Sequence, residues 1–577
     1  MLTKENPAHA APDEATTVSG AEAVILSLLA EKTDTIFGYP GGAIMPVYDA
    51  LYDYAGQVNH ILVRHEQGAI HAAQGYARVS GKVGVCLATS GPGATNLITG
   101  LADAKADSTP VVCITGQVAS GLLGTDAFQE ADVISITSAV TKWNIQVTQA
   151  ADIPAAISKA FYLAQSGRPG PVLIDITKDA QFAKVPFRYE KCEQVAYYTP
   201  KPPLDQQAAE QAAALINRSR KPLILAGQGV HLAGAHAELL ALAAKADIPV
   251  ATTLLGLSAI PSEHPLYVGL LGMHGNYAPN IKTNEADLII AVGMRFDDRV
   301  TGRTDTYAKQ ASIIHIDLDP AEINKIIKAD VALVADAREA LAALARLVKE
   351  SEHQAWLQEF RACMDQEYEK VVRHDLFPVD NRILTMGEVL RMVNELAEED
   401  SMLVTDVGQH QMVASRYFNF RSLNSNLTSG GLGTMGFALP AAIGAKAGRP
   451  GAQVIAVIGD GGFQMNIQEL GTMMQTGLAV KVIILNNNFL GMVRQWQQLF
   501  FEKRYSSVEM DNPDFVKIAE GYGISARKVE QRAELADTLR AVLSSPHAEV
   551  LEVVVGREDN VFPMIPTGAC VSEVRLE

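Results

Sequence analysis

Oxygen-bearing side chains follow two consecutive strand-like runs in the last third of the sequence. Asp460 comes directly after the apolar run 454–458, and Asn486 and Asn487 come directly after a second run, 480–485. Because neighbouring parallel strands end at the same edge of a sheet, we expect Asp460 and Asn487 to converge. One carboxylate and one amide oxygen form an incomplete cage, which suits Mg²⁺ that keeps phosphate oxygens and water in its shell. The spacing therefore predicts a magnesium–phosphate site.

Glycines surround the candidate metal ligand Asp460. They let backbone N–H groups approach a phosphate, and the helix expected after Gly462 adds partial positive charge at its start. A Gly-Asp-Gly triplet alone is usually only a turn. The whole pattern of strand, Gly-Asp-Gly, 24 residues and Asn-Asn is far more specific. It resembles the binding motif of the thiamine-diphosphate-dependent enzymes, and the resemblance implies a further metal contact from the backbone carbonyl of Phe489.

A candidate acid, Glu66, lies in the first third of the chain. It follows a short apolar run and opens an Ala-rich helical stretch. At such a position an arbitrary glutamate is usually explained by its favourable interaction with the helix dipole alone. Together with the segments 37–43 and 90–96, however, 64–69 resembles the pyrimidine-binding domain of the same enzymes. The resemblance implies that Glu66 protonates N1′ of the aminopyrimidine, so that the 4′-imino group can remove the C2 proton of the thiazolium.

The resemblance also implies an assembly and a bent cofactor. In this family the glutamate and the diphosphate site come from different subunits, so a homodimer or homotetramer with interfacial active sites is expected. Met435 matches the bulky apolar residue that bends the cofactor beneath its thiazolium, although a methionine there is also a plausible core filler. The implied thiamine-diphosphate contacts are Tyr39, Pro40, Gly41, Gly42, Pro92, Asn96, Gln409, His410, Gly433, Met435, Gly459, Asp460, Gly461, Gly462, Met465, Asn487, Gly491 and Met492.

Within the family, the sequence resembles the FAD-containing acetolactate (acetohydroxyacid) synthases over about residues 19–568. Glu66 is present, whereas glyoxylate carboligase lacks that acid, and the paired histidines of pyruvate decarboxylase are not apparent. The segments 271–275, 293–299 and 491–497 look like motifs of the biosynthetic synthases. The FAD-free catabolic type lacks the second of these motifs.

The resemblance to these synthases assigns roles to further residues. Arg299 would hold the carboxylate of the second 2-oxo acid through a charge-assisted fork; the alternative is a surface arginine paired with a neighbouring aspartate. Trp496 would shape a pocket that prefers 2-oxobutyrate to pyruvate; the alternative is a buried aromatic. Gln117 would lie near the reacting intermediate, and Lys178 would line the site.

The middle of the chain contains a strand-like run that leads into Gly227-Gln-Gly229. A third glycine and an acid about 20 residues later are missing, which argues against an NAD-type domain. By resemblance the domain binds FAD, and because the proposed reaction moves no net electrons, the flavin would be non-redox. The implied FAD contacts are Arg168, Gly227, Gly229, Thr253, Leu254, Met273, His274, Arg295, Asp297, Asp317 and Asp336.

Alternating Val/Ile runs and helical stretches predict an α/β protein with three domains, each a mostly parallel sheet flanked by helices. We expect a disordered leader (1–18), a pyrimidine-binding domain (19–184), a linker (185–204), a central FAD-binding-like domain (205–347), a helical linker (348–379) and a diphosphate- and Mg-binding domain (380–577). The first and last domains share a strand–glycine turn–helix design. Either all α/β domains look alike in this respect, or the two arose by duplication around one ligand.

The 577 residues include 48 Lys and Arg against 65 Asp and Glu, a net charge of −17. This balance argues against nucleic acid and anionic membranes as partners. Five dispersed cysteines without a CxxC motif argue against a disulfide framework and a structural zinc site, and favour the cytoplasm. No signal peptide, transit peptide or membrane span is expected.

The expected function is that of a transferase in branched-chain amino-acid (isoleucine and valine) biosynthesis. It would decarboxylate pyruvate and ligate the hydroxyethyl group to a second pyruvate or 2-oxobutyrate. Two rivals stay open: a pyruvate oxidase or decarboxylase, and a catalytically silent scaffold of the same fold, against which the intact set Glu66, Asp460 and Asn487 speaks. A small regulatory subunit, the acceptor preference and the choice between dimer and tetramer also stay open.

Overall fold

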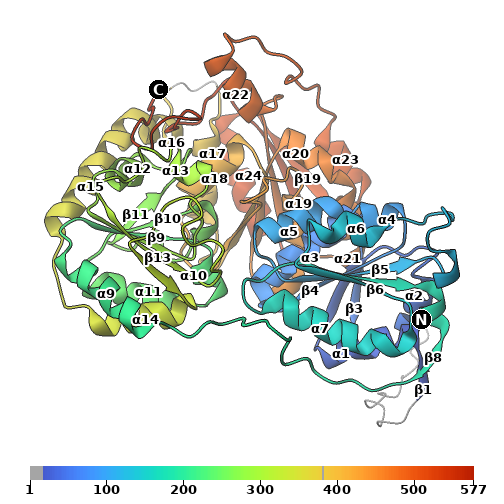
Figure 1. Cartoon of the computed structure of the whole chain (residues 1–577). Helices are drawn as coiled ribbons and strands as arrows, with labels where there is room; N and C mark the ends of the chain where they lie inside the picture. Colours follow the sequence, from blue (N-terminus) through green and yellow to red (C-terminus); the bar gives the residue numbers. More distant parts are fainter. Residues whose placement is uncertain (1–16, 380–382) are drawn as a thin grey trace. The chain divides into compact units, whose positions relative to one another are not determined.

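The computed structural model describes residues 17–379 and 383–577 and contains three six-stranded sheets with helices on their faces (Figure 1). All neighbouring strands in these three sheets run parallel. The predicted α/β fold with three parallel sheets is therefore confirmed. The chain divides into two compact units, the first ending at Tyr198 and the second starting at Thr199. The first unit holds one of the six-stranded sheets and the second unit holds the other two.

The sheet of the first unit has the strand order β3-β2-β4-β5-β7-β6. Its buried Val/Ile/Leu-rich strands suit a parallel sheet covered on both faces. Helices α1 and α7 pack together against one face, and α3 and α5 against the other (Figure 1). The strands are β2 (Thr35–Gly38), β3 (Asn59–Leu62), β4 (Gly84–Ala88), β5 (Val111–Gln117), β6 (Trp143–Val147) and β7 (Val172–Thr177). The helices are α1 (Gly20–Ala30), α2 (Met45–Asp53), α3 (Glu66–Ser80), α4 (Pro92–Thr95), α5 (Ile98–Ala106), α6 (Val133–Ser138), α7 (Ile153–Gln165) and α8 (Lys178–Phe182).

The ends of the first unit differ from the expected boundaries. Strand β1 (Thr17–Ser19) pairs antiparallel with β8 (Lys184–Pro186). The pairing takes in residues assigned to the leader and to the linker, because Val18 and Val185 are both buried at this ribbon. The rest of the expected leader lies outside the described residues.

The second sheet, in the middle of the chain, has the order β11-β10-β9-β12-β13-β14. Helices α9, α11 and α14 pack on one face, and α12 and α15 on the other (Figure 1). The strands are β9 (Pro222–Ala226), β10 (Val250–Thr252), β11 (Tyr267–Leu270), β12 (Leu288–Val292), β13 (Ser312–Asp317) and β14 (Val331–Val334). The helices are α9 (Gln206–Arg218), α10 (Gly229–Leu232), α11 (His236–Lys245), α12 (Tyr277–Thr283), α13 (Asp298–Thr301), α14 (Ala337–Leu347), α15 (Gln354–Glu367) and α16 (Arg373–Leu376).

The third sheet has the order β16-β15-β17-β18-β20-β19, with α17, α18 and α24 against one face. The strands are β15 (Met402–Thr405), β16 (Asn426–Thr428), β17 (Val454–Gly459), β18 (Val480–Asn486), β19 (Ser525–Val529) and β20 (Glu549–Val554). The helices are α17 (Met386–Leu396), α18 (Gln409–Tyr417), α19 (Ala438–Gly448), α20 (Asp460–Met465), α21 (Leu470–Thr476), α22 (Gly491–Phe500), α23 (Phe515–Gly521) and α24 (Arg532–Ser544).

The carboxyl-terminal segment leaves the third sheet and packs on the middle one. Ile565, Cys570 and Val571 belong to the apolar core of the middle sheet. The backbone N–H of Ile565 donates to the carbonyl of Met273 at 2.8 Å. The last residues of the chain thus contribute to the middle core, although the sequence suggested one continuous block, 380–577. Within the described part of the chain, no helix is long and apolar enough to cross a bilayer.

Candidate cofactor and active site

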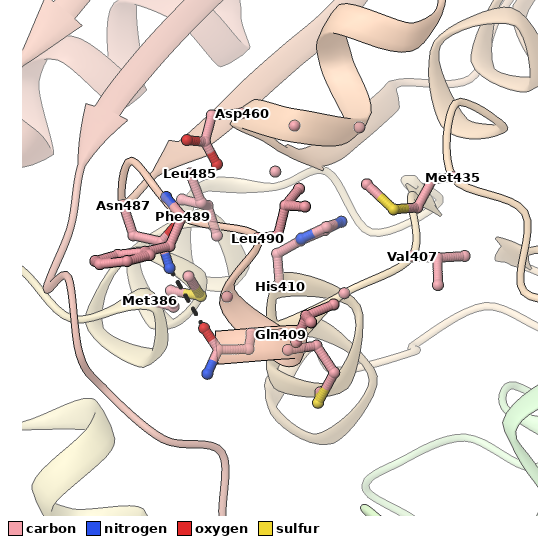
Figure 2. Close-up of a pocket in the computed structure, with 17 residues that line it drawn as sticks. Met386, Val407, Gln409, His410, Met435, Asp460, Leu485, Asn487, Phe489 and Leu490 are labelled. Atoms are coloured by element: carbon pink, nitrogen blue, oxygen red, sulfur yellow. Dashed lines mark hydrogen bonds between the residues drawn. The ribbon is translucent and has the colours of Figure 1, made fainter. Parts of the chain in front are cut away.

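A pocket lies at the carboxyl ends of β15, β17 and β18 (Figure 2). In this sheet the chain reverses its direction of strand addition between β15 and β17, and open α/β sheets bind ligands at such a switch point. The strands bring together segments that are far apart in the sequence. The lining residues are Met386, Val407, Gly408, Gln409, His410, Met435, Gly459, Asp460, Gly461, Gly462, Leu485, Asn487, Phe489, Leu490, Gly491, Met492 and Val493.

Asp460 begins α20 directly after the buried strand β17, and it is only 2 % exposed. Burial raises the pKa of its carboxyl group to about 6, because removal from water disfavours the charged form. The groups that donate to it are the side-chain amide of Asn512, at 2.6 Å, and backbone N–H groups. These donors carry no net charge, so a bound cation would supply the missing compensation.

Asn487 faces the same pocket from the end of β18, and Figure 2 shows it beside Phe489 and Gln409. Its side-chain N–H group donates to Gln409 Oε1 at 3.3 Å, and its Oδ1 accepts the N–H of Phe489 at 3.1 Å. Gln409 in turn donates to Gln495 Oε1 at 2.8 Å. The orientation of the Asn487 amide is thereby fixed, with nitrogen toward Gln409 and oxygen toward the turn that contains Phe489.

His410 supplies a neutral polar group to the pocket. The ring is buried, which lowers its pKa to about 3 and keeps it uncharged near neutral pH. It packs directly against Gly459, where a Cβ atom would lie 2.8 Å from His410 Nδ1. Its Nε2 atom has no hydrogen-bond partner within the described residues. A buried, unpaired ring nitrogen in a pocket is suited to a polar ligand atom.

The carboxylate of Asp406 organises the loop that carries Met435. It is fully buried and accepts the backbone N–H groups of Val407 at 2.8 Å, Gly436 at 3.0 Å and Ala438 at 3.1 Å. A Cβ atom on Gly462 would lie 2.7 Å from Asp406 Oδ1, so this glycine packs against the same carboxylate. Asp406 therefore ties the Met435 loop to the Gly-Asp-Gly turn. Asp406 was not predicted from the sequence, although it follows the apolar run 402–404 much as Asp460 follows 454–458.

In the first unit, Glu66 opens α3 and is 8 % exposed. Asn96 donates to Glu66 Oε2 at 2.9 Å, and a Cβ atom on Gly93 would lie 3.4 Å from Glu66 Oε1. The expected contacts Pro92 and Asn96 thus belong to the glycine turn beside this carboxyl group. The expected contacts 39–42 follow the neighbouring strand β2 at the same edge of the sheet.

Gln117 ends β5 and Lys178 follows β7 at that edge, but the structure does not present Gln117 to a ligand. Its side chain is fully buried, and its amide donates to Ala131 O at 2.9 Å and to Asp175 Oδ2 at 3.0 Å. Its Oε1 accepts the N–H of Val118. These interactions hold the chain segment that follows β5 in place. A direct contact between Gln117 and the substrate stays a prediction.

Backbone turns meet closely at the switch point of the middle sheet. A Cβ atom on Gly227 would lie 2.3 Å from Gly293 O, and one on Gly293 would lie 2.4 Å from the Cα atom of Gly229. Gly293 also has φ +55°, a conformation that favours glycine. The turn after β9 and the turn after β12 are therefore in close backbone contact, at the kind of topological switch point where open α/β sheets bind dinucleotides.

The other expected FAD contacts follow the carboxyl ends of successive strands of the middle sheet. Thr253 caps the turn after β10, and Asp336 caps α14 after β14. Asp297 caps α13 after β12 and lies 3.6 Å from Arg295. Met273 and His274 follow β11, and Asp317 ends β13. Arg168 belongs to the first unit, where it donates to Ser108 Oγ at 2.9 Å.

Arg299 and Trp496 both have side chains that are at least partly exposed. The Arg299 side chain is 62 % exposed and lies 3.8 Å from Asp298, as in the surface-pair alternative, while its Nη1 approaches Met273 Sδ at 3.2 Å. Trp496 is partly exposed, one helical turn after the pocket-lining Met492, and its ring contacts Phe500. Trp496 is therefore not a fully buried core aromatic in this chain.

Three families match successive parts of the chain. They are the thiamine pyrophosphate enzyme N-terminal TPP binding domain (18–136), central domain (209–344) and C-terminal TPP binding domain (406–553). The chain is 46 % identical to the acetolactate synthase large subunit of Corynebacterium glutamicum (98 % of this chain, 91 % of the relative). It is also 46 % identical to the isozyme 2 large subunit of Escherichia coli (96 % and 99 %), and 44 % identical to a probable large subunit of Methanocaldococcus jannaschii (96 % and 95 %).

The chain belongs to the acetolactate synthase large-subunit family. This membership confirms the resemblance on which the sequence analysis relied, and it agrees with the two TPP binding domains that contain Glu66 and Asp460. Most of the expected diphosphate-end contacts in the second unit line one pocket. Met465 is an exception: it ends α20 and is half exposed, and it and Gly433 are not among the residues that line the pocket.

The close backbone contact in the middle sheet predicts that Gly293 tolerates no side chain. Gly293→Ala adds a Cβ atom 2.4 Å from Gly229 Cα and requires an unfavourable φ. Overpacking and a left-handed non-glycine residue together cost about 2–5 kcal/mol. We expect a lower midpoint of thermal unfolding. Gly451→Ala is the matched control, because nothing lies within 4 Å of its added Cβ atom; equal midpoints for both variants would contradict the prediction.

Proposed function

We propose that this chain is the catalytic subunit of an acetolactate synthase. It decarboxylates pyruvate with thiamine diphosphate and ligates the hydroxyethyl group to a second pyruvate or to 2-oxobutyrate. The observation that carries the proposal is the switch-point pocket, in which Asp460 and Asn487 converge, in a chain 43–46 % identical to acetolactate synthases. When bound, thiamine diphosphate supplies the carbon nucleophile and the electron sink for decarboxylation.

The chemistry of the pocket residues fits a magnesium ion that would be held together with the diphosphate. Asp460, Asn487 Oδ1 and the carbonyl of Phe489 are hard oxygen donors, the type that Mg²⁺ prefers. The uncompensated burial of Asp460 favours a cation, and the glycine turn at the start of α20 offers backbone N–H groups to phosphate. Asp460, Asn487 and Phe489 would hold the metal, and Gly459, Gly461, Gly462 and His410 would contact the diphosphate.

At the other end of the cofactor, Glu66 would hold a proton at N1′ of the aminopyrimidine. The donation from Asn96 and the glycine turn at Gly93 orient its carboxyl group. Met435, Leu490 and Met492 give the pocket an apolar wall that excludes water from the reacting carbon. Arg299 would bind the carboxylate of the second 2-oxo acid, and Trp496 would shape the space for its side chain.

FAD, subunit partners and location complete the proposal. The glycine turns after β9 and β12 fit the backbone approach that a dinucleotide needs, so the middle sheet would bind FAD, with no redox step because carboligation moves no net electrons. Glu66 would act on the cofactor of a partner subunit in a homodimer or homotetramer, as the family resemblance implies. A small regulatory subunit and a cytoplasmic location stay predictions.

The decisive experiment identifies the product. Purified protein is incubated with pyruvate, Mg²⁺, FAD and thiamine diphosphate, with and without 2-oxobutyrate. Formation of 2-acetolactate, and of 2-aceto-2-hydroxybutyrate in the mixed assay, supports the proposal. Acetaldehyde or acetyl phosphate as the main product would instead identify a decarboxylase or an oxidase.

Glu66→Gln tests the acid. The glutamine keeps the shape but cannot exchange a proton with N1′, so we expect turnover to fall by roughly 10²–10⁴. The readout is the rate of acetolactate formation at saturating cofactor, together with cofactor affinity, which should change little. Glu193→Gln, at an exposed position of the same unit, is the control. Near-normal turnover of the Glu66 variant would remove this residue from the mechanism.

Trp496→Leu tests the acceptor pocket. Loss of the indole surface should leave acetolactate formation largely intact while the preference for 2-oxobutyrate declines. A pocket wall of this kind discriminates one methylene group by about 1–3 kcal/mol, or roughly 10–200-fold. The measurement is the ratio of the two products at equal concentrations of the competing acceptors, and an unchanged ratio would rule out the assignment.

A further inference from the structure

A short return segment, Val508–Asn512, runs antiparallel to the turn Asn488–Leu490 that contains the proposed carbonyl ligand. Leu490 N–H donates to Val508 O at 2.8 Å, and Met510 N–H donates to Asn488 O at 3.0 Å. Phe489 is bridged to Glu509 between these two bonds. The metal-binding turn is therefore held from outside by a segment that comes after α22.

In this register the backbone N–H and carbonyl groups of Phe489 form no hydrogen bond with the return segment. The carbonyl is therefore available to the proposed metal site. In an antiparallel pair, the two residues between successive hydrogen bonds exchange none with each other. Phe489 holds this position, and its N–H donates to Asn487 Oδ1 instead. Its ring lies under the guanidinium of Arg557, at 4.8 Å, and Arg557 forms an ion pair with Glu509 at 2.5 Å. The return segment thus fixes the Phe489 turn without using the Phe489 carbonyl in the pairing.

The return segment ends in Asn512. Its side-chain amide contacts residues at the carboxyl ends of both β17 and β18. Its Nδ2 donates to Asp460 Oδ2 at 2.6 Å, to Asn488 Oδ1 at 2.9 Å and to Asn486 Oδ1 at 3.0 Å. An amide nitrogen has two hydrogens, so one of them is shared between two acceptors. The bond to Asp460 is charge-assisted and short, which makes it the strongest of the three.

The orientation of the Asn512 amide is settled by its other end. Asn512 Oδ1 accepts a hydrogen bond from Gln464 Nε2 at 2.9 Å, and the same Nε2 donates to the backbone carbonyl of Asp460 at 3.2 Å. A flipped amide would place two donors against each other at Gln464 and oxygen against three oxygens at the strand ends. The arrangement therefore has one satisfied orientation.

We propose that Asn512 is a positioning residue for the divalent cation: it holds the Asp460 carboxylate and the Asn486–Asn488 turn at the spacing that the metal requires. By donating to Asp460 Oδ2, it holds this carboxylate in one orientation. It also keeps the Asn486 and Asn488 oxygens from repelling the carboxylate. Outer-shell partners of this type are commonly worth 10–100-fold in metal affinity. The inference rests on the proposed function.

The test measures how binding of thiamine diphosphate depends on Mg²⁺, which needs no turnover. Thiamine diphosphate is titrated calorimetrically into the full-length protein at a series of Mg²⁺ concentrations. For Asn512→Ala we expect the half-saturating Mg²⁺ concentration to rise about 10–100-fold, with binding recovered at high Mg²⁺. Asn512→Gln, which keeps the amide donor, should restore part of the affinity. Asp511→Ala is the matched control, because that exposed neighbour makes none of these contacts.

A purely structural role predicts a different result. In that case Asn512→Ala would lower the midpoint of thermal unfolding while the folded protein kept the wild-type Mg²⁺ dependence, and the proposal would be overturned. Should Asn512→Ala fail to fold, Asn512→Leu carries the same test, because it keeps a similar side-chain volume but has no donor for Asp460; a normal Mg²⁺ dependence would again overturn the proposal. Two further proteins separate this inference from the proposed function. Asp460→Asn, which lacks the proposed ligand carboxylate, shows the result expected when the metal site itself is lost. Mg²⁺-independent binding of thiamine diphosphate by the wild type would refute the proposed cofactor chemistry itself.

Discussion

The buried carboxylate of Asp460 is the constraint on which the site depends. Taking this group out of water raises its pKa to about 6, so near neutral pH the charged form persists at a cost that amide donors alone do not offset. The strand ends, the glycine turn and the Asn487 amide all place oxygen or N–H groups around it. The chemistry of these donors suits a hard cation with an anionic partner, as proposed above.

The first and third sheets share one topology. Numbered within each sheet, β3-β2-β4-β5-β7-β6 and β16-β15-β17-β18-β20-β19 both read 2-1-3-4-6-5, whereas the middle sheet reads 3-2-1-4-5-6. A generic α/β resemblance does not require identical orders, so the match favours duplication over convergence of local design. The first and third sheets carry different chemical groups at the carboxyl ends of their strands. The first sheet presents the carboxyl group of Glu66, and the third presents Asp460 and Asn487.

The sequence predicted those parts of the site that follow from strand order. Asp460 and Asn487 converge because adjacent parallel strands end together, a rule that needs only the apolar runs before them. Asp406 and Asn512 were missed for different reasons. Asp406 follows a short run with no glycine signature, while Asn512 reaches the site through a return segment whose register depends on tertiary packing. Met465 was assigned to the cofactor by resemblance, and its half-exposed side chain at the end of α20 leaves that contact a prediction.

The middle sheet connects the proposed flavin site to the proposed acceptor site through one short segment. Gly293 is locked against Gly229 at the switch point, and Arg299 lies six residues later on α13. The backbone of Arg299 accepts the N–H of Met273 at 2.7 Å, and Met273 in turn accepts the N–H of Ile565 from the carboxyl-terminal segment. A ligand bound beside Gly293, as proposed for the flavin, would therefore act on the segment that carries Arg299. A flavin with no redox step can contribute to carboligation in this way, by rigidity alone.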